Sequence, residues 1–196
     1  MKHKKTLAEL PAEQGIIETK QNGSVFLWSK SESGFDIVTK AIQYFTGSPY
    51  THVAIYLRGS TYDCTVWKPA GRILSVSGVR ETTGVIDGWQ VELKPTTTLT
   101  SSQTDKILSY CKAMIDARRP YNVFKLLAFI LIYPTRWFWT KIKWVPFQAE
   151  LFGEVCSTFV DQAYEAGGIN LFPDIIDEAA VPGDFIDTPL LEIVNG

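Results

Sequence analysis

Cysteine, histidine and net charge are all scarce in this chain. Its 196 residues include three cysteines and two histidines, and the formal charge is −2. Without a C-x-x-C pair or histidines at metal-ligand spacing, the three cysteines give no basis for a disulfide framework or a structural zinc site. The small charge leaves no basic field of the kind that nucleic-acid binding requires. We therefore expect reduced thiols, no metal or organic cofactor, and no nucleic-acid partner.

Long apolar runs are missing as well. The longest, LLAFILIY at 126–133, is far shorter than the roughly 18 residues that span a bilayer. The N-terminal stretch MKHKKTLAELPAEQG begins with basic residues but has no apolar run of signal-peptide length. These absences predict a cytoplasmic or peripherally membrane-attached protein without a signal peptide, a description that a phage or viral product also fits.

The apolar residues that are present suffice for one core. They make up 45% of the sequence, against 20% charged residues, which is typical of a single domain at this length. Residues 1–22 are polar and aperiodic, so they are predicted to form a flexible N-terminal arm. The single domain is expected to span 23–196, with an aromatic insert at about 124–147.

Hydrophobic periodicity predicts the order of the elements. In the first long helix after the strands, Ser102 with Asp105 makes a weak capping box, and Cys111 falls on the apolar face and should lie in the core. The predicted elements are a strand over 23–29, a helix within 34–49, a hairpin over 51–67, strands within 71–79 and 88–95, a helix from Ser102, a helix after Pro120, and a cysteine-bearing helix that begins near Val155.

The segment GEVCSTFVDQAYEAGG at 153–168 places a cysteine where a helix begins. If that helix starts near Val155, Cys156 lies in its first turn, where free backbone N–H groups and the positive end of the helix dipole favour a thiolate. The same N–H groups, with Ser157 beside them, suit the oxyanion that forms when sulfur attacks a carbonyl carbon. A buried and inert cysteine is the plainer alternative.

A nucleophilic cysteine needs a base, and the histidines of this chain are His3 and His52. His3 falls in the predicted arm. His52 follows a proline-containing loop in SPYTHVAIYL, at the mouth of a predicted strand, where rigid scaffolds commonly carry catalytic groups. A structural histidine that pairs with the backbone is the alternative interpretation. His52 is thus the candidate base for Cys156.

Four short motifs, in a fixed order over about residues 22–170, resemble one known family. They are GSVFLW, SPYTHVAIYL with a polar residue in the following strand, RRPYNVF, and CSTFVDQAYEAGGI. Together they resemble the circularly permuted branch of the NlpC and papain-like superfamily, the YiiX-type cysteine hydrolases, which are related to the lecithin:retinol acyltransferase group. In that branch the histidine strand precedes the cysteine helix. The resemblance implies an α+β permuted papain-like fold, in which a small antiparallel sheet or half-barrel packs against helices.

The resemblance also implies roles for individual residues. Cys156 would be the nucleophile and His52 the general base, with a third polar residue that steers the imidazole. Such families place this residue on the strand after the histidine, where STYDCTVW offers Asp63 as its one carboxylate. If the hairpin turns on Gly59-Ser60, Tyr56 faces Asp63, and strand alternation places Asp63 on the face of His52. The other interpretations are an ordinary hairpin aspartate, Cys64 if the turn has three residues, and Thr65 as a fallback.

Two further features follow from the same resemblance and from the aromatic insert. Tyr121 in RRPYNVF matches a tyrosine often found before the cysteine segment of this branch, and it would line the cleft, support the oxyanion, or simply pack. The insert interleaves aromatic rings with Arg and Lys, which suits peripheral contact with a membrane. A core helix followed by a packed loop is the alternative. The tryptophans of the insert that would make this contact are Trp137, Trp139 and Trp144.

The expected activity is that of a cysteine hydrolase without a cofactor. It would act through an acyl-thioester on an amide or peptide bond, as in a cell-wall-type peptide or isopeptide. The first alternative is a lipid thioesterase or acyltransferase that forms the same intermediate from an acyl ester. The second is a catalytically inactive relative that binds a peptide or a lipid.

Overall fold

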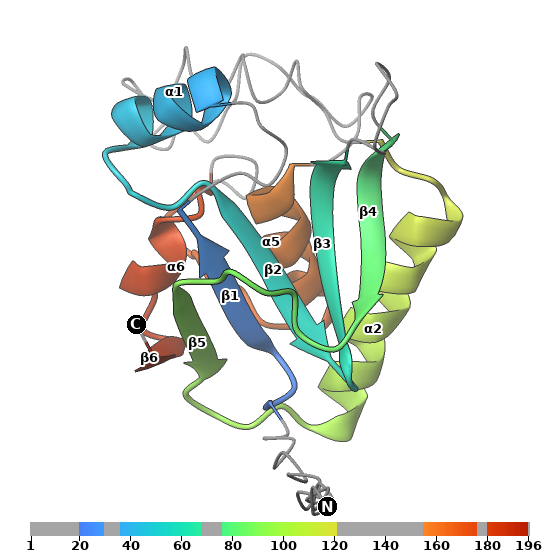
Figure 1. Cartoon of the computed structure of the whole chain (residues 1–196). Helices are drawn as coiled ribbons and strands as arrows, with labels where there is room; N and C mark the ends of the chain where they lie inside the picture. Colours follow the sequence, from blue (N-terminus) through green and yellow to red (C-terminus); the bar gives the residue numbers. More distant parts are fainter. Residues whose placement is uncertain (1–19, 30–35, 68–75, 121–154, 176–179, 196) are drawn as a thin grey trace, which may run out of the picture.

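Short runs rich in β-branched and aromatic residues form one antiparallel sheet in the described part of the chain. The computed structural model describes residues 20–29, 36–67, 76–120, 155–175 and 180–195. Six strands lie in the order β4-β3-β2-β1-β5-β6 (Figure 1). They are β1 (Ser24–Trp28), β2 (His52–Leu57), β3 (Ser60–Trp67), β4 (Val76–Thr83), β5 (Val91–Pro95) and β6 (Leu191–Asn195).

Helices cover one face of this sheet. The long helix α2 packs against β4 and α5, and α5 packs against β2 and β3, as Figure 1 shows. The α+β class with an antiparallel sheet against helices is therefore confirmed. The described helices are α1 (Asp36–Thr46), α2 (Ser101–Asp116), α5 (Cys156–Ala166) and the short α6 (Asp184–Asp187).

A two-residue turn joins β2 to β3. Arg58 and Gly59 both have positive φ, 47° and 88°, as a type I′ hairpin turn requires. The predicted turn on Gly59-Ser60 was therefore wrong, because Arg58 takes the left-handed conformation that side chains other than Asn, Asp and Gly seldom adopt. Ser60 is instead the first residue of β3.

The turn sets the register of the hairpin. Asp63 lies opposite Ala54, and not opposite Tyr56 as predicted. The difference is two residues along β2. Because side chains alternate with a period of two, a shift of two keeps every side chain on its face. Asp63 consequently still shares a face of the sheet with His52.

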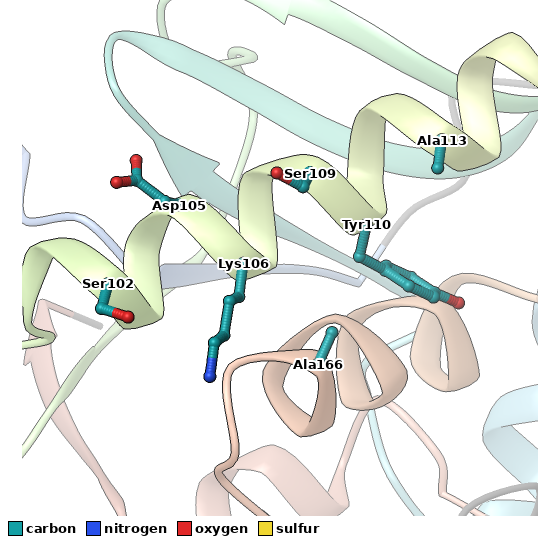
Figure 2. A pocket seen from close by; sticks show the side chains of 7 residues that line it. All are labelled: Ser102, Asp105, Lys106, Ser109, Tyr110, Ala113 and Ala166. Carbon is teal, nitrogen blue, oxygen red and sulfur yellow. The ribbon is translucent and has the colours of Figure 1, made fainter.

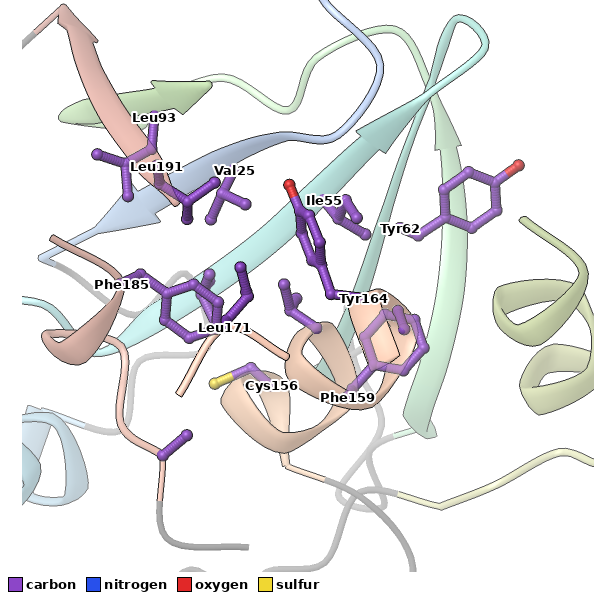
Figure 3. Close-up of a cluster of buried hydrophobic side chains, with 14 of the residues drawn as sticks. Val25, Ile55, Tyr62, Leu93, Cys156, Phe159, Tyr164, Leu171, Phe185 and Leu191 are labelled. Atoms are coloured by element: carbon purple, nitrogen blue, oxygen red, sulfur yellow. The ribbon is translucent and has the colours of Figure 1, made fainter. Parts of the chain in front are cut away.

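The two faces of the sheet bury different material. On the helix side, one large apolar cluster includes Cys111, which is fully buried as predicted. On the other side lies a smaller cluster around Phe26, Trp28 and Ala54. Figure 3 shows the large cluster between the sheet and α5, with labelled side chains Val25, Ile55, Tyr62, Leu93, Cys156, Phe159, Tyr164, Leu171, Phe185 and Leu191.

The start of α2 differs from the prediction. Thr100, and not Ser102, caps this helix: its Oγ1 accepts from the backbone N–H of Gln103 at 3.2 Å. In return Gln103 Oε1 accepts from the Thr100 N–H at 3.0 Å. This pair forms a reciprocal capping box. A hydroxyl at position 100 with a glutamine three residues later satisfies both orphan donors, so Asp105 is not needed for capping.

The C-terminal residues complete the sheet, which sequence periodicity did not predict. Strand β6 pairs antiparallel with β5, with an irregularity between Glu92 and Leu93.

At the other end of the described chain, Lys20 Nζ lies 2.7 Å from Glu92 Oε2. Within the described ranges, no helix combines the length and hydrophobicity that crossing a membrane requires.

Several predicted features lie outside the described residues. These are residues 1–19 of the arm, the helix after Pro120, Tyr121, and the aromatic insert with Trp137, Trp139 and Trp144.

Candidate active site

Helix α5 begins at the cysteine. Cys156 is its first residue, with Val155 as N-cap, so the predicted start of this helix is confirmed. Thr158 Oγ1 accepts from the Val155 N–H at 3.3 Å, which satisfies one orphan donor of the helix start. The first N–H groups within the helix have no acceptor in a preceding turn. Cys156 and the buried Ser157 therefore carry donors at the positive end of the helix dipole.

His52 and Asp63 form a close pair at the end of the sheet. His52 Nε2 lies 2.9 Å from Asp63 Oδ2. The Asp63 side chain is fully buried, while that of His52 is 20% exposed. His52 is the first residue of β2, so its ring is held by a strand yet lies at the strand's end. Such a position gives a rigid ring that can still reach a neighbouring element.

The same ring reaches the sulfur of α5. Cys156 lies near enough to the ring to raise the pKa of His52, as Asp63 does. The Cys156 sulfur also lies 4.0 Å from the carbonyl oxygen of Thr51, the residue before the histidine. Because Nε2 is engaged by Asp63, Nδ1 is the ring nitrogen left for the sulfur. The imidazole thus contacts the carboxylate directly and interacts electrostatically with the thiol.

The charges of these partners determine the protonation of the histidine. Burial of the ring lowers the pKa of His52, but the hydrogen bonds to Asp63 and Cys156 and the charges of both groups outweigh burial and raise the pKa from 6.5 to about 10. The imidazole is therefore protonated at neutral pH.

A guanidinium completes the surroundings of Asp63. Arg80 of β4 lies directly opposite Asp63 in the sheet. Its Nε donates to Asp63 Oδ1 at 2.8 Å, and its Nη2 donates to Asp63 Oδ2 at 3.2 Å. Burial raises the pKa of Asp63, whereas His52 and then Arg80 lower it, and the net pKa lies below the ordinary value. The carboxylate is therefore ionised at neutral pH.

An aromatic ring supports the histidine from the neighbouring strand. Trp28 of β1 lies opposite His52, and the two ring centroids are 5.4 Å apart with a tilt of 50°. The indole N–H of Trp28 donates to the Asp87 carbonyl at 3.1 Å, which fixes the indole. This arrangement limits the freedom of the imidazole and shields part of it from water.

The structure brings Cys156, His52 and Asp63 together from three separate elements. Cys64, the alternative third residue, is buried in the large cluster with Cys156 and Val53, on the other face of the sheet from Asp63. Arg80 was missed by sequence reasoning. Only the pairing of β3 with β4 places Arg80 beside Asp63, and no local sequence motif predicts that pairing.

A shallow depression elsewhere on the surface is separate from this site. It lies between α2 and the end of α5, lined by Ser102, Asp105, Lys106, Ser109 and Tyr110 with Ala166 (Figure 2). Ala166 and Cys156 are the last and first residues of α5, and a rise of about 1.5 Å per residue puts them roughly 15 Å apart. The depression therefore belongs to the far end of the helix.

Fold and site together define an α+β protein in which a histidine contacts a buried aspartate and lies near a cysteine at a helix start. The fold is similar to that of a solved structure, the metalloprotein YiiX (DUF1105) from Escherichia coli O157:H7, with a TM-score of 0.55. The similarity covers 89% of this chain and 96% of the YiiX chain at 18% sequence identity. A YiiX-like fold, one part of the expected resemblance, is confirmed. No family model matches the chain, and no curated protein matches its sequence.

Proposed function

We propose that this protein is a cysteine hydrolase of the permuted NlpC and papain-like type, which cleaves an amide or peptide bond through an acyl-thioester on Cys156. One observation carries the proposal: His52 Nε2 lies 2.9 Å from the buried Asp63, and both Asp63 and the cysteine at the start of α5 raise the pKa of the ring. A core cysteine would need neither an imidazolium nor the amide donors of a helix N-terminus.

The first half of the reaction uses the thiolate and the protonated ring. The sulfur attacks the carbonyl carbon, and the N–H groups at the start of α5 stabilise the oxyanion. The carbon–nitrogen bond then breaks while His52 Nδ1–H gives its proton to the leaving amine. The products of this half are a free amine, an acyl-thioester on Cys156 and a neutral imidazole.

The second half returns the site to its starting state. His52 Nδ1 takes a proton from water, and the resulting hydroxide attacks the thioester carbon. The carbon–sulfur bond breaks, which releases the acid and restores the thiolate and the imidazolium. Throughout, Asp63 holds the tautomer in which Nδ1 faces the sulfur and stabilises the positive ring.

The metalloprotein description of YiiX raises the question of a metal here. Arg80 occupies both oxygens of Asp63, and a second cation at this carboxylate would be repelled by the guanidinium. Among the described residues, no group of three His, Cys, Asp or Glu side chains is placed to hold a metal ion. The donor set therefore fits a metal poorly, and the mechanism takes no step through one.

A second candidate function is favoured by the residues near the sulfur. Cys156 belongs to the same apolar cluster as Leu171 and Phe185, which Figure 3 shows beside it. An apolar wall suits an acyl chain, so a lipid thioesterase or acyltransferase that acts on an acyl ester is the alternative. Both activities form the same acyl-enzyme and differ in the leaving group.

Intact-mass analysis tests the proposal and separates the two functions. The protein is incubated with peptide amides, cell-wall peptides and acyl-ester lipids, and the mass of any covalent acyl group is recorded. We expect an adduct in the wild type that is absent from Cys156→Ala, and the substrate that supplies it identifies the function. A protein that gains no acyl mass, and whose alkylation rate rises only near the ordinary thiol pKa of about 8.5, would instead be an inactive binding relative.

A further inference from the structure

One buried carboxylate is shared between two positively charged partners. Asp63 has no exposed side-chain surface. Its Oδ2 accepts from both His52 and Arg80, and its Oδ1 accepts from Arg80. Rotation of the carboxylate would break both contacts with the guanidinium, so the orientation of Oδ2 toward the histidine depends on Arg80.

We infer that Arg80 is a positioning residue of this site, which keeps Asp63 ionised and turned so that Oδ2 faces His52 Nε2 and Nδ1 is left for Cys156. In this role Arg80 acts on the reaction only through Asp63, and it does not itself touch the substrate. The inference rests on the proposed function, since it assigns the residue that organises the proposed site.

An ordinary cross-strand ion pair does not account for this arrangement. Exposed ion pairs between neighbouring strands contribute little to stability, and both of their side chains stay in contact with water. Here the carboxylate is removed from water, which disfavours its charged form unless hydrogen bonds compensate. The guanidinium supplies two donors in a fixed planar fork. A lysine at position 80 would supply charge without that geometry.

Loss of Arg80 should change how Asp63 titrates. The charged side chains that act on Asp63 are His52 from β2 and Arg80 from β4, and Cys156 of α5 lies beyond the histidine. Without the guanidinium, burial continues to disfavour the carboxylate while one of its two compensating partners is gone. Asp63 then takes up a proton at higher pH, and a protonated Asp63 no longer stabilises the imidazolium.

The imidazole of His52 reports this titration directly. The chain contains two histidines, His3 and His52, so His3→Gln leaves a single ring for NMR. In this background we expect Arg80→Met to move the acid step in the His52 ring shifts upward by about one pH unit or more. Arg80→Lys should lie between wild type and Arg80→Met, because it keeps the charge and loses the fork.

Reactivity of the sulfur gives a second measurement, with iodoacetamide as the probe and Cys156→Ala as the background. The ratio of alkylation rates at pH 5 and pH 8 should fall about tenfold or more in Arg80→Met. Glu81→Gln is the matched control, because Glu81 is the neighbouring β4 residue and accepts from the Tyr62 hydroxyl at 2.9 Å. It perturbs the same strand pair and should leave the ratio within about twofold.

The results of these experiments distinguish failure of the proposed function from failure of the inference about Arg80. If wild-type sulfur alkylates as an ordinary thiol, the proposed function fails. If the wild type is reactive at low pH but folded Arg80→Met keeps both the wild-type His52 titration and the wild-type ratio, the inference about Arg80 is overturned. Should Arg80→Met not fold, Arg80→Lys decides, because an unchanged acid step in that variant contradicts a role for the fork.

Discussion

At the scale of single residues, the candidate site depends on the two nitrogens of one ring. Asp63 Oδ2 lies 2.9 Å from Nε2 of His52, and this hydrogen bond leaves Nδ1 as the ring nitrogen available to the sulfur. A change that alters the partner of Nε2 should therefore act on the chemistry at Nδ1, even though the substituted side chain never meets the substrate.

Substitution of the sulfur gives the simplest residue-scale prediction. Cys156→Ala should abolish covalent acylation, because it removes the sulfur that the proposed mechanism uses as nucleophile. Cys111→Ala is the control: Cys111 is fully buried in the core, so this variant should lose stability by about 2 kcal/mol or less and keep its acyl adduct. Acylation measured by intact mass, and unfolding measured by denaturant titration, check both outcomes. An adduct that persists in Cys156→Ala contradicts the assignment of the nucleophile.

Replacement of the carboxylate tests the histidine pair. Asp63→Asn keeps the shape of the side chain but removes its charge, so the pKa of His52 should fall from about 10. The proposed reaction needs the imidazolium as proton donor, so its rate should decline as pH rises through the His52 pKa, and at lower pH in the variant. We expect kcat/KM to fall by about 10²–10⁴. A pH–rate profile checks the shift, and an unchanged upper limb would rule out Asp63 as the residue that sets it.

At the scale of elements, strand β4 is held in place by the segment that follows α2. Gly78 has a φ of +148°, and a Cβ there would lie 2.5 Å from the Arg119 carbonyl oxygen. The next amide, that of Val79, donates to the same oxygen at 3.4 Å. This close approach of backbone to backbone fixes β4 two residues before Arg80, so the contact also determines where the guanidinium lies.

Gly78→Ala should accordingly affect both stability and the site. We expect a loss of about 2–3 kcal/mol in unfolding free energy, from the clash together with the strained backbone. Gly84→Ala is the control, since Gly84 also has positive φ, 78°, but nothing lies within 4 Å of an added Cβ. It should lose only the conformational part, about 1 kcal/mol. Equal losses in the two variants, measured by denaturant unfolding, would contradict the importance of the Arg119 contact.

Local sequence predicted the elements better than their pairing. Strand β1 and helix α5 have strong local signals, a β-rich run after a glycine and an apolar face ended by two glycines, and both were predicted. The register of the hairpin was wrong by two residues because Arg58 adopts positive φ, which composition does not indicate. Strand β6 was missed because it is a short edge strand that forms only against β5.

The residues of the candidate site show the same difference between local features, which sequence predicts, and long-range pairing, which it does not. Cys156 and His52 could be selected from sequence because helix starts and strand mouths are local features. Asp63 was selected as the one carboxylate on the strand where the resemblance implies a polar partner for the histidine. Strand alternation, which survives a register error of two, kept it on the face of His52. Arg80 could not be selected, because its position opposite Asp63 depends on how β3 and β4 align. Long-range pairing decides which polar side chains meet, and one sequence does not encode it in any short pattern.

At the scale of the whole molecule, the raised pKa of His52 links stability to pH. The folded-state pKa of about 10 exceeds the ordinary value of 6.5, so protonation of His52 stabilises the fold fully below about pH 6.5. That contribution is lost as pH rises through about 10. The unfolding free energy of wild type should therefore decline between these two values.

Comparison with the variant His52→Gln isolates the contribution of His52 to the pH dependence of the unfolding free energy. Burial raises the pKa of Cys111 from 9.0 to about 12, which also makes stability decline, but above about pH 9. The difference in unfolding free energy between wild type and His52→Gln removes this shared contribution. We expect the difference to shrink as pH rises from 6.5 to 10, as measured by urea unfolding at a series of pH values. A difference that stays constant with pH would show that the ring has no such linkage.

The separation of the two reacting groups along the chain has a consequence for biosynthesis. The imidazole is contributed by β2 and the thiol by α5, and the strands between them must pair before the two can meet. The ribosome therefore releases the histidine strand long before Cys156, and a growing chain that ends between them carries the proposed base without the proposed nucleophile. The proposed nucleophile can therefore meet its base only after the sheet and α5 have both been synthesised and have folded together.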